Sequence, residues 1–286
     1  MKTTAKTILV TARQMLRHPR SLAIFGVLYA GLLASLYGFV ATREATVGQV
    51  ALTLVFLLLT PASFFLLQAA IIHHARDRRI GWGVALASAG KLFVVTLPMI
   101  ILGIALFVLL NRWEPQAPAG IAFPSSWPSG GNWSPSTGQA VSTSLHWPTV
   151  LFATLRWVVF GVVLPLMTIG LWIEAANYNL RTLLGGGLRS LSRRLVGVMA
   201  RVFATESVVT YTVGLVLFAL IPYALLFAAV PASGPRTEFA ILIARLALAF
   251  VFTLFGWVLT ITTLVREVGE NHTQNSSQVS FDLSYV

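Results

Sequence analysis

Six long apolar stretches constrain this chain more than any other feature of its sequence. They run over residues 22–40, 47–72, 90–110, 149–174, 207–230 and 239–265. The hydrocarbon layer of a membrane is about 30 Å thick, and about 20 apolar residues cross it as a helix. None of the stretches has the short apolar and polar alternation of a barrel strand. Because a span in lipid must satisfy its own backbone, the sequence predicts an all-α, polytopic membrane protein with six transmembrane helices.

The composition excludes a soluble enzyme. Of the 286 residues, 56% are apolar and 10% are charged, whereas a soluble domain is about 45–50% apolar and about 25% charged. So few charges cannot cover a soluble globule of this size, and the high apolar content also excludes a disordered or fibrous chain. Cysteine is absent, which excludes disulfides and thiolate metal sites.

The basic residues predict the orientation. The segments 1–21, 73–91, 175–206 and 266–286 carry 15 Lys and Arg, and the opposite loops carry 3. Loops rich in Lys and Arg stay in the cytoplasm, so we expect both termini to be cytoplasmic, in the inner (plasma) membrane of a bacterium. The net charge of +11 then reflects topology and contact with anionic inner-leaflet lipid. Membrane lipids are the expected partners, and nucleic acid is not.

Two basic, amphipathic segments are predicted to lie along the cytoplasmic surface as interfacial helices. Residues 1–20 form one, with Ile8, Leu9, Ala12, Met15 and Leu16 on one face. Residues 178–204 form the other, with Leu188, Leu191, Leu195, Met199 and Val202 opposed by arginines. Either helix could lie in the headgroup layer or pack against the protein's own spans. Residues 21–266, which include the second of these segments, make up the transmembrane domain.

Two further segments are candidate contact surfaces for protein partners. The outer loop 111–148 holds four of the eight Trp, with many Pro, Gly and Ser. Such a composition does not form regular structure, and its Trp either anchor the outer interface or form a lid or a partner surface. Residues 267–286 are polar and are expected to form a flexible cytoplasmic tail.

Arg156 and Arg245 are the most informative residues in the spans. Each lies six or seven residues from the outer end of its span, about 10 Å deep at 1.5 Å per residue. An arginine inside a membrane costs about 2.5–3.5 kcal/mol even on lenient scales. One hypothesis is that the pair binds an anion or a lipid headgroup. The alternative is that each reaches the outer headgroups or pairs with an acid such as Glu238.

Prolines and small residues mark the packing of the spans. Pro61, Pro98, Pro165 and Pro222 each interrupt a span and are expected to kink it. Gly26, Ala30, Ala34 and Gly38 are spaced by four along the first span. Such a stripe lets another helix approach closely, either within the chain or in a dimer.

No catalytic or cofactor motif is present. The chain has no P-loop, no G-x-S-x-G and no H-E-x-x-H. His73 and Asp77 share a helix face, but a third metal ligand is not in sight. We therefore expect no catalytic residue, no metal site and no cofactor, and the sequence favours a protein that is not an enzyme.

The chain resembles the bacterial six-helix membrane domains that are fused to some glycerophosphodiester phosphodiesterases. The resemblance rests on Arg17-His18-Pro19 before the first span, residues 69–82 after the second and residues 188–203 before the fifth. It implies membrane placement and no catalytic residue, since a phosphodiesterase domain is not present.

Two functions remain open. Kinked helices and the arginine pair favour a transporter or permease-like protein for an anionic or lipidic solute. The Trp-rich loop, the polar tail and the lack of acids within the spans favour an accessory or scaffold subunit of a larger membrane complex. A polar cavity between the helices would distinguish the first from the second.

Overall fold

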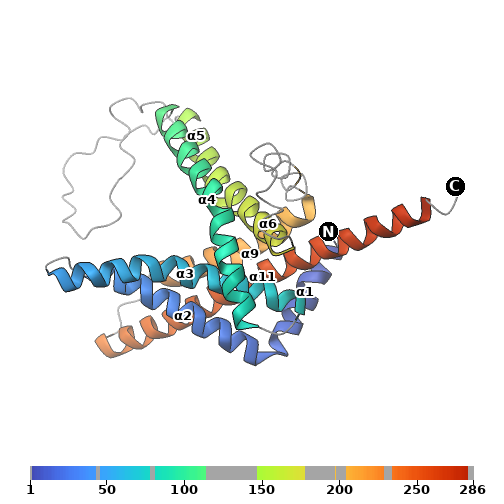
Figure 1. Ribbon diagram of the computed structural model, residues 1–286. Coiled ribbons are helices and arrows are strands. Elements are labelled where there is room, and N and C mark those ends of the chain that lie inside the picture. The colour runs from blue at the N-terminus through green and yellow to red at the C-terminus, as the bar shows by residue number, and fades with distance from the viewer. Residues whose placement is uncertain are drawn as a thin grey trace. The chain divides into compact units, whose positions relative to one another are not determined.

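All six predicted spans are present as helices long and apolar enough to cross a membrane. The computed structural model describes residues 2–42, 46–77, 81–113, 147–177, 197, 204–228 and 234–282 (Figure 1). The candidate spans are Pro19–Ala41, Val47–Arg76, Trp82–Trp113, Val150–Ala176, Thr205–Phe227 and Arg236–Val268. The predicted all-α, multi-pass membrane fold is therefore confirmed.

Two of the six spans consist of more than one helical segment. The first four helices are α1 (Lys2–Leu16), α2 (Pro19–Ala41), α3 (Val47–Asp77) and α4 (Trp82–Trp113). The fourth span joins α5 (Trp147–Val158) to α6 (Leu164–Asn177) through the π-helical turn η1 (Val159–Val163). The fifth joins α9 (Thr205–Leu215) to α10 (Ile221–Phe227) through the turn η2 (Val216–Leu220), and α11 (Pro235–Asp282) follows.

The chain divides into two compact units. The first comprises Met1–Leu97 and Leu166–Val286, and the second is Pro98–Pro165. The boundaries fall at two of the prolines singled out in the sequence, one in α4 and one at the start of α6. Each unit is described by itself below.

Helix α11 forms the core of the first unit. Residues 258–265 are all buried, and a helix that is buried on every side has neighbours all round it. Arg266 of α11 donates to Thr11 of α1 at 3.1 Å. Glu267, the next residue, accepts a hydrogen bond of 2.7 Å from Thr210 of α9.

Hydrogen bonds that side chains make to other side chains, and in one case to a backbone oxygen, tie the other helices of this unit together. Such bonds hold transmembrane helices in register because lipid offers polar groups no other partner. They join α2 to α3, α3 to α4, α3 to α6, and α4 to α6. The bonds are Thr60 to Ser35 at 3.2 Å, His73 to Ser88 at 3.0 Å, Arg76 to the Ile173 oxygen at 2.9 Å, and Trp172 to Thr96 at 2.8 Å.

Helix α1 shows which part of its predicted apolar face packs against the protein. Thr11 and Met15 are buried, and Thr11 accepts the bond from α11. Leu9 and Leu16, which the sequence places on the same face as Met15, are exposed. One part of this face, at Met15, therefore packs against the spans, and the other part, at Leu9 and Leu16, stays exposed.

The end of the chain differs from the expected flexible tail 267–286, because α11 continues as one helix to Asp282. No proline follows Pro235 in this helix, so no residue lacks the N–H that the helix needs or clashes with the preceding turn. A helix that extends an existing span also avoids the cost of a new nucleus.

Two predicted features lie outside the described residues. These are the amphipathic helix 178–204, of which only residues 197 and 204 are described, and most of the loop 111–148. At the ends of that loop, Trp113 closes α4 and Trp147 opens α5, and both side chains are exposed. Their exposure fits the proposed anchoring at an interface.

Candidate functional site

Arg156 contacts two side chains of α4 within the second unit. Its Nη2 donates to Asn111 Oδ1 over a long 3.4 Å. Its guanidinium carbon lies 5.7 Å from the centre of the Phe107 ring, a distance at which a cation is attracted to the face of an aromatic ring. Both contacts reduce the cost of a charge at this depth without requiring an acid.

Arg245 caps a helix end within the first unit. Its Nη1 donates to the Ala228 carbonyl oxygen at 2.6 Å, and Ala228 is the C-terminal cap of α10. The C-terminus of a helix carries partial negative charge, so a guanidinium is stabilised there. This carbonyl is a partner that sequence reasoning missed, because it belongs to the backbone of a different span.

Arg156 belongs to the second unit and Arg245 to the first, and each is described within its own unit. Each has a neutral oxygen partner within its own unit. Their proposed role as a joint anion- or headgroup-binding site therefore stays a prediction.

Two of the four prolines follow π-helical turns, which the sequence analysis did not anticipate. Pro61 and Pro98 lie inside α3 and α4. Before Pro165 and Pro222, a backbone N–H bonds five residues back, from Leu164 to Val159 and from Ile221 to Val216. The wider turn relieves the clash of a proline ring with the carbonyl four residues earlier. In both places one aliphatic residue separates the π-helical turn from the proline, and the sequence itself carries no signal of the turn beyond that proline.

The small-residue stripe of the first span faces more than one neighbour within the chain. A Cβ on Gly26 would lie 3.7 Å from Leu254 of α11, and one on Gly38 would lie 2.5 Å from the Phe56 ring of α3. Ala30 and Ala34 between them are exposed. Four residues turn a helix by about 400° at 100° per residue, so the stripe rotates by about 40° at each step. Residues 26 and 38 thus meet different helices.

An apolar cleft of about 190 Å³ lies within the first unit, at the level of the spans. Helices α2, α3 and α11 and the turn η2 form its walls. The residues that line it are Tyr29, Leu32, Phe64, Leu67, Gln68, Phe218, Thr253, Leu254 and Trp257. Aromatic rings in the wall also contact one another, as between Phe218 and Trp257, whose ring centres are 5.1 Å apart.

Gln68 is the most unusual residue of this cleft. Its side chain is only 1% exposed, and its Oε1 accepts a hydrogen bond of 2.9 Å from Trp257 Nε1. An indole N–H can only donate, so the amide oxygen must face it and the amide nitrogen must point elsewhere. That nitrogen is buried without a hydrogen-bond partner among the described residues. A buried donor without an acceptor costs about 1–3 kcal/mol, which makes this position a candidate contact for a ligand.

His73 and Asp77, which the sequence places on one helix face, belong to no cluster of metal ligands among the residues that the structure describes. His73 is hydrogen-bonded to Ser88, and the side chain of Asp77 lies outside the described residues. Among the residues described, no group of three His, Asp or Glu lies together.

No protein-family model, curated protein or solved structure matches the chain, so its resemblance to the membrane domains of glycerophosphodiester phosphodiesterases stays a prediction.

Proposed function

We propose that the protein is a permease-like protein of the bacterial inner membrane that binds and moves a lipidic solute. The apolar cleft, with the buried amide donor of Gln68 in its wall, carries this proposal. A small hydrated anion would lose its hydration against such a wall. An acyl chain with a nearby ester carbonyl suits the cleft better, because the carbonyl could accept from Gln68.

The size of the cleft supports binding of part of a lipid. Pockets that enclose drug-sized ligands measure about 300–1,000 Å³, and this cleft measures about 190 Å³. It can therefore hold a segment of one chain while the rest of the lipid stays in the bilayer.

The interrupted helices support movement of the solute. Phe218 lies in both the cleft wall and the π-helical turn η2, and such turns are weak points of a helix. Pro98 and Pro165 lie where the two units divide. Since proline removes a backbone hydrogen bond, bending at these positions costs less than elsewhere.

The cleft can be tested by blocking it. The full chain is reconstituted into phosphatidylcholine vesicles that contain NBD-labelled phosphatidylglycerol, and dithionite quenching measures movement of the label between leaflets. We expect wild-type protein to accelerate that movement and Leu32→Trp to slow it, because an indole would fill the space beside Leu32.

Leu33→Trp is the matched control, since Leu33 is the next residue of α2 and its side chain is exposed. It should retain wild-type rates. Equal rates in vesicles with and without protein, or equal loss in both variants, would contradict the proposal.

The orientation gives a second test. The count of 15 basic residues on one set of segments against 3 on the other places both termini in the cytoplasm. Phosphatase reporters fused after residue 130 and after residue 280 should therefore be active and inactive, respectively. Activity of both fusions, or of neither, would exclude the six-helix orientation.

A scaffold or accessory subunit is the second candidate, and the length of α11 favours it. The last candidate span ends at Val268, whereas α11 continues to Asp282, about 21 Å further at 1.5 Å per residue. Removal of residues 269–286 should then abolish association with a membrane partner while lipid movement in vesicles stays unchanged.

A further inference from the structure

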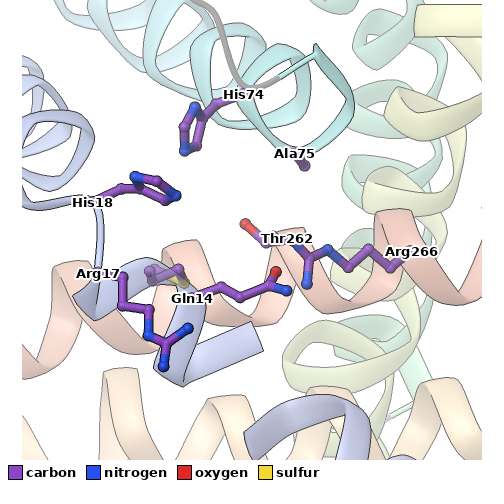
Figure 2. A pocket seen from close by; sticks show the side chains of 8 residues that line it. Gln14, Arg17, His18, His74, Ala75, Thr262 and Arg266 are labelled. Carbon is purple, nitrogen blue, oxygen red and sulfur yellow. The ribbon is translucent and has the colours of Figure 1, made fainter. Parts of the chain in front are cut away.

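A second cavity of about 180 Å³ lies where three helix ends meet in the first unit. Helix α1 and the start of α2 form one side, the last turn of α3 another, and α11 the third (Figure 2). The polar residues in its lining are Gln14, Arg17, His18, His74, Thr262 and Arg266. None of them lines the apolar cleft, so an inference about this cavity is independent of the proposed function.

The lining is cationic. Arg17 and Arg266 carry permanent charges, and no acid is present among the eight residues that line the cavity. His18 is also the N-terminal cap of α2, and the first turn of that helix holds no acid. The N-terminus of a helix carries partial positive charge, which adds to the charge of the guanidinium groups.

The hydroxyl of Thr262 is a buried donor without a partner in the described part of the chain. Thr262 is 4% exposed, and its Oγ1 has no hydrogen bond. Its neighbours on α11 behave differently, because Thr260 donates to the Gly256 oxygen at 2.6 Å and Thr263 to the Leu259 oxygen at 2.8 Å. Figure 2 shows the Thr262 oxygen directed into the space that the rings of His18 and His74 face.

We propose that this cavity binds a phosphate group, either of a phospholipid headgroup or of a soluble phosphate. A phosphate has several oxygens that accept hydrogen bonds from different directions. The guanidinium of Arg266, the ring nitrogens of both histidines and the Thr262 hydroxyl supply donors from three helices. Arg17 lines the exposed rim of the cavity, and its guanidinium points away from the two imidazole rings in Figure 2. A change of its side-chain rotamer would bring into the cavity a charged donor of the kind that binds phosphate most strongly.

The site can be tested by binding measurements on the purified full chain in dodecyl maltoside. The probes are inorganic phosphate, matched with chloride for ionic strength, and dihexanoyl phosphatidic acid. We expect saturable binding, detected as a rise in the unfolding temperature with probe concentration.

Two variants should weaken that binding. Arg17→Gln removes a charged hydrogen bond and should raise the dissociation constant about tenfold or more. Thr262→Val removes one neutral donor at almost constant shape and should raise it about threefold to tenfold.

Matched controls keep the test specific. Arg13→Gln removes the same charge four residues earlier, within α1, but Arg13 is outside the lining. Thr263→Val removes a hydroxyl that already bonds to the backbone. Both should bind like the wild type.

Binding of both probes assigns the site to free phosphate, and binding of the lipid alone assigns it to a headgroup. No saturable binding of either probe, or equal weakening by Arg13→Gln and Arg17→Gln, would overturn the proposal.

Discussion

Replacement of Trp172 by alanine is expected to destabilise the first unit by about 3 kcal/mol or more. Trp172 is 3% exposed on α6 and donates to Thr96 of α4. Its ring packs edge-on against Phe64 and Phe65 of α3, with centroid distances of 5.8 and 6.3 Å. The side chain thus joins three helices, and its removal leaves a cavity at their junction.

The expected loss of stability depends on which energetic contributions of the buried tryptophan also apply in a membrane. In water, the cost of removing a large buried side chain is about 3–5 kcal/mol and includes the transfer of apolar surface. In lipid the transfer share is small, because the separated helices are also solvated by apolar chains. The lost packing dominates, so the lower end of the range applies. Loss of the hydrogen bond adds little, since the Thr96 hydroxyl still donates to the Leu92 oxygen.

The measurement is reversible unfolding in mixed micelles by titration with sodium dodecyl sulfate. Trp172→Phe should lose only about 1 kcal/mol, because it keeps an aromatic ring and leaves a much smaller cavity than alanine. Trp157→Ala is the control, since Trp157 of α5 is 59% exposed. Similar losses for Trp172→Ala and Trp157→Ala would show that this aromatic junction does not hold the helices together.

The six spans could be predicted because lipid imposes one requirement on all of them, which is length at low polarity. Each observed span contains almost all of the predicted one and extends past it at one end or both, by three residues at Trp113 and Arg236 and by eight at Trp82. These ends are amphipathic or charged residues that hydropathy excludes but that a helix accommodates at an interface. The apolar pattern therefore locates a span well and its last turn poorly.

The two cavities could not be predicted, because their residues come together only through packing. His18 caps α2, His74 lies in α3 and Arg266 in α11, and each by itself looks like a solvated end of a span. Gln68 is likewise one polar residue in an apolar run, and only the structure shows that its oxygen is bonded to Trp257 while its nitrogen has no partner among the described residues. The sequence instead drew attention to Arg156 and Arg245, whose cost in lipid is visible without a structure.

The π-helical turns were missed for a different reason. A π-helical turn adds one residue to a turn without changing its apolar character, so η1 and η2 leave no trace in hydropathy. Only the proline that follows each turn marks it, and Pro61 and Pro98 lie in helices where no such turn precedes them. A proline alone therefore does not decide between a kink and a π-helical turn.

Gly256→Leu is expected to separate α11 from the turn η2, at a cost of at least about 3 kcal/mol. A Cβ at residue 256 would lie 2.8 Å from both the Leu217 Cβ and the Phe218 backbone nitrogen. Gly214 of α9 makes the reciprocal contact, since a Cβ there would overlap the side chain of Thr260. Two glycines thus allow the helices to cross in close contact, and backbone atoms cannot move aside as a flexible side chain could.

Gly31→Leu is the matched control, because Gly31 lies within α2 and nothing is within 4 Å of a Cβ placed there. Leucine in place of glycine favours a helix by up to about 1 kcal/mol, so this variant should be neutral or slightly more stable. At residue 256 the same gain is smaller than the cost of overpacking, and the sign of the effect reverses.

Displacement of η2 would also move Phe218 away from Trp257 across the apolar cleft, so lipid movement in vesicles should fall together with stability. A Gly256→Leu protein that unfolds at the same detergent concentration as Gly31→Leu would show that the crossing tolerates a side chain and that the close approach does not shape the cleft.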